Sequence, residues 1–227
     1  MSATPRQTGS DKPLSTKQQR AAERERKLEA FRKKEARSKR NRKLGLIGAI
    51  VGVVAIAGLL VASIVFAPRP ATYAGGGTGT GADIEGVELF ENTSNHVTTP
   101  VDYAQTPPAG GEHNPAWLNC GVYTEPVPNE NAVHSLEHGA LWVTYDPSLS
   151  EEELATLRSK LPSSYVILSP FEDLPSPIVV SGWNSQLQVD EADDPRIEAF
   201  FEEFWKSNLV PEPGALCSGG VDGPGKA

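Results

Sequence analysis

Residues 44–67 read LGLIGAIVGVVAIAGLLVASIVFA, a run of 24 residues without a charged side chain. As an α-helix, a run of this length spans about 36 Å, because each residue adds about 1.5 Å. The hydrocarbon core of a bilayer is about 30 Å thick, so the run is long enough to cross it with a modest tilt. A cleaved signal peptide is the alternative, but its apolar region is usually only about 7–15 residues long. The sequence therefore predicts a transmembrane helix over residues 44–67.

Charge is distributed unevenly on the two sides of this run. Before Leu44 there are 15 basic and 5 acidic residues, and after it there are 6 basic and 24 acidic residues. Basic residues collect on the cytoplasmic side of a membrane-spanning helix. We therefore expect a single-pass protein of the cell membrane, with residues 1–43 as a basic cytoplasmic tail and the acidic part of the chain as an extracytoplasmic domain.

The basic tail has few apolar side chains, and Leu28 and Phe31 are the only large ones between residues 15 and 43. Pairs such as Glu23 and Lys27 have the i,i+4 spacing that supports a solvated helix. The charge suits the anionic lipids of the inner leaflet as a binding partner. Nucleic acid is not expected as a partner, because stacking aromatic residues do not interleave with the basic ones.

The rest of the chain divides by composition. Residues 68–82, PRPATYAGGGTGTGA, lack the large apolar side chains that an ordered core needs, which predicts a flexible linker. Residues 83–221 hold all the Trp, His and Cys residues and are numerous enough to form one domain with its own core. We expect residues 222–227 to be a disordered C-terminus.

The hydrophobic pattern of residues 83–221 predicts two helices. Ser150 and Glu153 have the spacing of a capping box, and leucines follow on one helix face up to Pro162. Asp194 and Pro195 begin a second helix with a wide aromatic face. Four short apolar or alternating segments predict strands, at residues 139–146, 165–168, 178–183 and 186–189.

The order of these elements predicts an α+β domain, in which a small mixed sheet packs against two helices. Residues 92–133 are rich in Pro and Gly and predict a long ordered loop. Cys120 lies in this loop and Cys217 lies near the C-terminus. Because the domain is expected in an oxidising compartment, a disulfide between them is the simplest interpretation, with a catalytic thiol or a metal thiolate as alternatives.

All four histidines of the chain, His96, His113, His134 and His138, lie within 43 consecutive residues. His134 and His138 share a face in a helix and in a strand alike, because they are four residues apart. Neutral imidazoles bind zinc, copper or nickel, and three or four of them can complete a coordination shell. The sequence therefore offers a metal site at these residues, with ordinary hydrogen-bonded loop histidines as the alternative.

The segment His134-Ser-Leu-Glu137-His138 also matches H-x-x-E-H, in which two histidines hold zinc and the glutamate is the base of a metallopeptidase. That chemistry needs a helix, whereas Asn129 to Asn131 predict a turn and Gly139 follows the motif directly. A third, carboxylate ligand from a later helix would be Glu198, Glu202 or Glu203. Glu137 would serve equally well as a residue that orients an imidazole, and the metallopeptidase is kept as a remote alternative.

Two blocks of the sequence resemble a known family. The blocks are PPAGGEHNPAWLNCGVY, from Pro107 to Tyr123, and VHSLEHGALWVTY, from Val133 to Tyr145. They are similar to the actinobacterial membrane proteins grouped as domain of unknown function 3105. The resemblance implies a short cytoplasmic tail, one anchor and an extracytoplasmic domain, and it supplies no function. Glu112 stands where a proline is expected in the family's loop.

Composition and motifs leave two classes of function open. Methionine occurs only at the start and cysteine only twice, which excludes a methionine-rich copper carrier and a cysteine-rich zinc module. The chain contains no G-x-S-x-G elbow and no phosphate-binding glycine loop, so nothing indicates an enzyme of those classes. The open alternatives are a metal-binding domain, with zinc or copper at the histidines, and an adaptor that binds another envelope protein.

Overall fold

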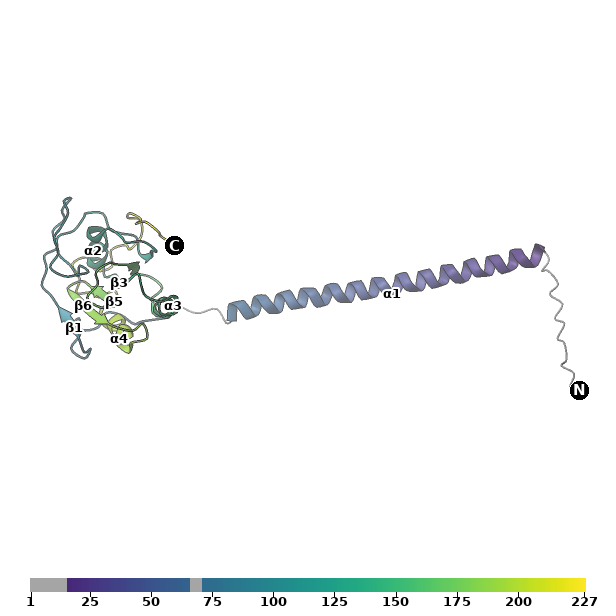
Figure 1. Ribbon diagram of the computed structural model, residues 1–227, viewed down its shortest axis with the longest axis horizontal. Helices are drawn as coiled ribbons and strands as arrows, with labels where there is room; N and C mark the ends of the chain where they lie inside the picture. The colour runs from purple at the N-terminus through teal and green to yellow at the C-terminus, as the bar shows by residue number, and fades with distance from the viewer. Residues whose placement is uncertain (1–15, 66–70) are drawn as a thin grey trace, which may run out of the picture. The chain divides into compact units, whose positions relative to one another are not determined.

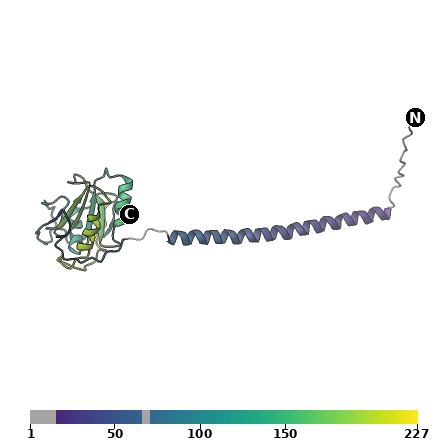
Figure 2. The same ribbon diagram turned by 90° about the horizontal axis from the view of Figure 1, so that it is seen from below.

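The computed structural model describes residues 16–65 and 71–227, which form two separate compact units (Figure 1). The first unit contains α1, a single helix from Thr16 to Val65. Figures 1 and 2 show it as one unbroken ribbon. The basic segment and the apolar segment therefore belong to one helix, and Glu23 and Lys27 form the expected ion pair at 2.6 Å. Among the described residues, α1 alone is long and apolar enough to span a membrane. Residues 66 and 67 of the predicted span lie outside the described part.

The second unit is built on a mixed six-stranded sheet with the strand order β1-β6-β5-β3-β4-β2. β4 is parallel to both of its neighbours, and the remaining pairs are antiparallel. The predicted α+β class is therefore correct, and the four predicted strands correspond to the four central ones. The strands are β1 (Val87–Leu89), β2 (Gly121–Val122), β3 (Leu141–Tyr145), β4 (Val166–Pro170), β5 (Ile178–Gly182) and β6 (Ser185–Val189).

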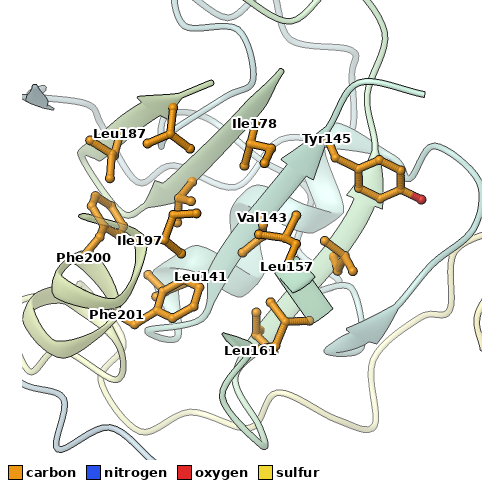
Figure 3. Close-up of a cluster of buried hydrophobic side chains, with 14 of the residues drawn as sticks. Leu141, Val143, Tyr145, Leu157, Leu161, Ile178, Leu187, Ile197, Phe200 and Phe201 are labelled. Carbon is orange, nitrogen blue, oxygen red and sulfur yellow. The ribbon is translucent and has the colours of Figure 1, made fainter. Parts of the chain in front are cut away.

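One face of the sheet is covered by the two predicted helices, α3 (Glu151–Lys160) and α4 (Pro195–Phe204). The Ser150 capping box is formed, and Asp194 caps α4 directly before Pro195. Alternate residues of β3 point to this face because side chains alternate along a strand. Figure 3 shows the resulting apolar cluster, which includes Leu141, Val143, Leu157, Ile197, Phe200 and Phe201.

The opposite face is covered by a helix that the sequence analysis did not predict, α2 (Asn129–Glu137). The turn expected at Asn129 to Asn131 is the first turn of this helix. Its propensity is low, but the buried side chains of Ala132 and Leu136 pack with Trp142 of β3, so tertiary packing stabilises it. Gly139 follows with a φ of +90°, a conformation that lets the chain leave the helix and enter β3.

The N-terminal part of this unit lies along α4, although its composition predicted a flexible linker. Tyr73 donates a hydrogen bond to the carbonyl of Lys160 at 2.6 Å, and its ring packs against Phe201 at 5.2 Å. Thr78 bonds the Glu203 carboxylate at 2.7 Å. Residues 68–70 of the expected linker lie outside the described part, but residues 71–82 are held by α3 and α4.

The C-terminal residues are also paired, which corrects the expectation of disorder over residues 222–227. The Thr124 amide donates to the Gly225 carbonyl, and the Ala227 amide donates to the Val122 carbonyl, both at 2.9 Å. β2 is an edge strand whose backbone groups need partners, and the C-terminal segment supplies them. The end of the chain is therefore part of the domain.

Candidate metal centre

α2 determines the position of the histidine pair that the sequence singled out. His134 lies in its last turn and His138 is its C-cap, so the two imidazoles share one side with ring centroids 4.6 Å apart. Both side chains are buried. Glu137 also lies in the last turn and is only 2% exposed. The helix therefore aims two imidazoles and one carboxylate into the space beneath the Pro/Gly-rich loop.

The loop brings the other two histidines to the same space. The backbone around His96 pairs with that around His113, since the Val97 amide donates to the His113 carbonyl at 2.7 Å. The loop is also bound to α2, because the Asn114 amide donates to the carbonyl of Glu130 at 3.2 Å. The His113 ring is fully buried, and its centroid lies 4.8 Å from that of His96 and 4.9 Å from that of His134.

Two overlapping groups of ligand atoms result, and within each group the atoms lie within 4.8 Å of one another. Ligand atoms of a tetrahedral zinc ion, with bonds of about 2.0–2.1 Å, lie roughly 3.3–3.4 Å apart. The distances between ligand atoms would therefore have to shorten by at most about 1.5 Å to bring either group to bonding geometry. We call them the inner set (His96, His113, His134 and Glu137) and the outer set (His134, His138 and Glu212).

Backbone carbonyls orient three of the four imidazoles. Nδ1 of His113 lies 2.7 Å from the Gly111 carbonyl, Nδ1 of His134 lies 2.6 Å from the Asn114 carbonyl, and Nδ1 of His138 lies 2.7 Å from the Leu216 carbonyl. A carbonyl oxygen only accepts, so each Nδ1 carries the proton and each neutral ring has its lone pair on Nε2. This is the arrangement of metal-binding histidines, whose second nitrogen donates to a carbonyl or carboxylate.

Glu137 lies at the centre of the inner set. Its Oε2 is 2.9 Å from Nε2 of His113 and 3.5 Å from Nε2 of His96. Both nitrogens of His113 therefore face oxygen acceptors, whereas a neutral imidazole has only one N–H to donate. One further positive charge, from a proton or a metal ion, is needed between His113 and Glu137. The predicted orienting role of Glu137 fits its position, which also makes it a direct ligand candidate.

His134 is shared by both sets and is held in its neutral form. The pKa of His134 is lowered to about 4, chiefly by burial and also by the neighbouring imidazoles of His138, His113 and His96, against the raising effect of the hydrogen bond to Asn114. Among residues 16–65 and 71–227, Nε2 of His134 has no hydrogen-bonding partner. The lone pair of this nitrogen is therefore available to a metal ion at neutral pH.

Glu212 is the site residue that the sequence analysis missed. Its Oε2 lies 3.3 Å from Nε2 of His138, and its amide donates to the carbonyl of Glu137 at 3.2 Å. It follows a proline in an irregular segment, so no periodicity indicated its position. The expected third carboxylate was wrong, because Glu198, Glu202 and Glu203 of α4 instead bind Lys160, the Ala74 amide and Thr78.

Cys120 and Cys217 form the predicted disulfide, which closes a separation of 97 residues. The bond excludes a thiolate ligand, because both cysteines of the chain are used. It also joins the loop to the segment that carries Leu216, whose carbonyl orients His138. The disulfide therefore supports the outer set from the C-terminal side.

Aromatic rings enclose the imidazoles. The Trp117 ring lies 5.3 Å from His138 and 5.9 Å from His134, and the Trp183 ring lies 5.7 Å from His113. Such walls lower the local dielectric constant and strengthen the attraction between a cation and its ligands. The sequence analysis assigned neither tryptophan to the site, because a tryptophan in a sequence is equally typical of a hydrophobic core.

The H-x-x-E-H motif lies on a helix after all, but the geometry does not suit the peptidase mechanism. In that mechanism the glutamate activates a water molecule on the metal, whereas here Glu137 is engaged by His113 and His96. The inner set also offers four ligands, the number found in closed structural sites rather than catalytic ones. The arrangement is suited to holding an ion.

Comparison with known proteins gives a family but no described activity. No curated protein matches the chain, and no solved structure matches it. One family model, described as a protein of unknown function (DUF3105), matches residues 96–219, which are more than half of the chain. The match begins at His96 and contains every member of the inner and outer sets as well as both cysteines. The chain therefore belongs to the DUF3105 family.

Proposed function

We propose that this protein is a membrane-anchored, extracytoplasmic protein that binds one divalent transition-metal ion. The observation that carries the proposal is the convergence of three imidazoles, those of His96, His113 and His134, on the buried carboxylate of Glu137. Three of the four rings have Nδ1 next to a backbone carbonyl, which leaves Nε2 of His113 and His134 for the inner set and Nε2 of His138 for the outer set. A set of ordinary loop histidines would have no reason to share this orientation.

The energetics of burial also favour a bound cation. Burying a polar or charged group is costly unless a partner compensates for the lost hydration. His113, His134, Glu137 and His138 are each 3% exposed or less, and His113 faces two acceptors at once. A metal ion would bind the lone pairs of the imidazoles and neutralise the carboxylate. An ion in the inner set would compensate three of the four buried groups, and the fourth, His138, has Glu212 as its partner.

The donor atoms narrow the choice of metal. Imidazole nitrogen and carboxylate oxygen suit Zn²⁺, Cu²⁺ and Ni²⁺, whereas Cu⁺ prefers sulfur ligands, which the site lacks. Zinc has no strong geometric preference and accepts a tetrahedral set of three nitrogens and one oxygen. We therefore take zinc as the first ion to test and copper(II) as the second.

Metal binding is tested by titrating the full-length chain in detergent micelles with Zn²⁺ and, separately, Cu²⁺. The wild type should bind one equivalent at micromolar concentration. His134→Ala should weaken binding about a hundredfold or more, since both ligand sets lose a donor. Glu152→Ala is the matched control, because Glu152 is an exposed carboxylate on α3, on the other face of the sheet. Absence of saturable binding to the wild type would refute the proposal and favour an adaptor.

The anchoring part of the proposal rests on α1. Its apolar half is flanked by basic residues on the N-terminal side, which favours a cytoplasmic N-terminus next to anionic lipids. Protease added to intact spheroplasts should remove the folded domain and spare residues 1–43. Cleavage within the basic tail would mean that the topology is reversed, and a soluble mature form would mean that the apolar segment is a signal peptide.

A further inference from the structure

We propose that the bound ion moves between the two ligand sets, being held by the inner set and exchanged with the surroundings at the outer set. This inference rests on the metal-binding function proposed above and adds a route for the ion. The rings of His96, His113 and His134 lie 4.8–4.9 Å from one another, and His138 leads from His134 to Glu212. His134 stands where the two sets meet.

The two sets cannot be filled together, because they share one donor atom. Nδ1 of His134 is bonded to the Asn114 carbonyl at 2.6 Å and must keep its proton. The neutral ring therefore offers one lone pair, on Nε2, and this lone pair serves one ion. A bridging imidazolate would leave Nδ1 and the carbonyl oxygen as two acceptors facing each other. One chain should consequently hold one ion, in one set or the other.

The sets differ in what they offer the ion. The inner set supplies four donors, of which His113 and Glu137 are buried completely or nearly so. Four protein ligands complete a tetrahedral shell and leave no position for an incoming ligand. The outer set supplies three donors and leaves a fourth position open. An ion in the outer set can therefore accept a ligand from water, from a chelator or from another protein.

The exposure of the ligand side chains also indicates that the ion exchanges at the outer set. The side chain of Glu212 is 46% exposed, whereas its partner His138 is 3% exposed. Glu212 thus connects solvent with the buried imidazoles, and the short step from His138 to His134, at 4.6 Å between ring centroids, connects the two sets. His96 is also exposed, by 40%, but it belongs to the closed four-ligand set and would have to leave the ion before exchange could occur there.

The test separates exchange rate from affinity in the full-length protein in detergent. Zinc-loaded protein is mixed with excess chromogenic chelator in a stopped-flow instrument, and the Kd is measured by competition at equilibrium. Glu212→Gln keeps the size of the side chain and removes its charge at an exposed position. It should slow uptake and release by about tenfold, and it should raise the Kd far less than His113→Asn does, because the inner set keeps its four donors. His113→Asn should instead raise the Kd about a hundredfold, and Glu152→Gln should change neither.

Three results would overturn the inference. The first is retention of two zinc ions per wild-type chain. The second is a Kd change for Glu212→Gln as large as that for His113→Asn, which would mean a single fused site. The third is unaltered exchange in Glu212→Gln, which would mean that the ion leaves at His96. Failure of the wild type to bind zinc or copper(II) at all is a different result, and it refutes the proposed function itself.

Discussion

The two faces of the sheet bury different kinds of side chain. The face under α3 and α4 is packed with aliphatic and aromatic residues throughout. The face under α2 buries a smaller apolar cluster together with three imidazoles and a carboxylate. Apolar burial stabilises a domain without directional requirements, whereas buried polar groups need partners at defined positions. The face under α3 and α4 therefore supplies most of the stability of the domain. The face under α2 contributes less, because it buries the polar side chains of the candidate metal site.

The largest expected effect is on the apolar face. Phe200 is fully buried in α4, and Phe200→Ala should lower the free energy of unfolding by about 3–5 kcal/mol, because it removes apolar contacts and leaves a cavity. Denaturant titration measures the loss. The folded fraction should keep the zinc affinity of the wild type. A drop in affinity as large as that of His113→Asn would show that the two faces are not separable.

The disulfide lies at the border of the site and should have the next largest effect. Replacing Cys120 and Cys217 by Ala together should cost about 2–5 kcal/mol of unfolding free energy, since the bond closes a long loop. The rate of zinc exchange should change more than the Kd for zinc, because loss of the disulfide loosens the segment that carries Leu216 and Glu212. Thiol alkylation of the denatured, unreduced wild type should label neither cysteine, and full labelling would contradict the disulfide.

Acid should destabilise the metal-free protein through the face under α2. The pKa of His134 is about 4 in the folded state, against 6.5 for an ordinary histidine. Between these pH values the unfolded chain binds a proton that the folded chain does not, so stability is full above about pH 6.5 and falls towards pH 4. We expect a loss on the order of 1–2 kcal/mol from this group. Thermal unfolding across this range checks the prediction, and His134→Gln should show a shallower slope.

The smallest expected effect is at the N-terminus of α3, one of the two helices on the apolar face. Ser150→Ala removes the hydroxyl that accepts from the Glu153 amide at 3.2 Å and should cost about 1 kcal/mol. Zinc affinity and the pH dependence should stay at wild-type values, because α3 lies on the opposite face from α2. A measurable change in the Kd for zinc would mean that strain passes through the sheet from one face to the other.

The same contrast explains what the sequence could predict. Strands and the helices α3 and α4 follow from alternation, capping residues and apolar faces, which are local signals. α2 has no such signal, because its stability comes from packing on Trp142 and from the loop above it. Clustering along the chain indicated the four histidines as candidates. Glu212 lies far from them in sequence, and only the folded chain brings its carboxylate to His138.

Binding of zinc by the histidine cluster is measured directly by X-ray absorption at the zinc edge of the zinc-loaded, full-length protein in detergent. We predict one zinc per chain with about four nitrogen and oxygen neighbours at about 2.0–2.1 Å. Outer-shell scattering should show three imidazoles, and it should lose at least one of them in His113→Asn. A sulfur neighbour at about 2.3 Å would mean that the disulfide opens to supply a thiolate ligand. A shell of oxygens without imidazole would mean that the histidine cluster is not the metal site.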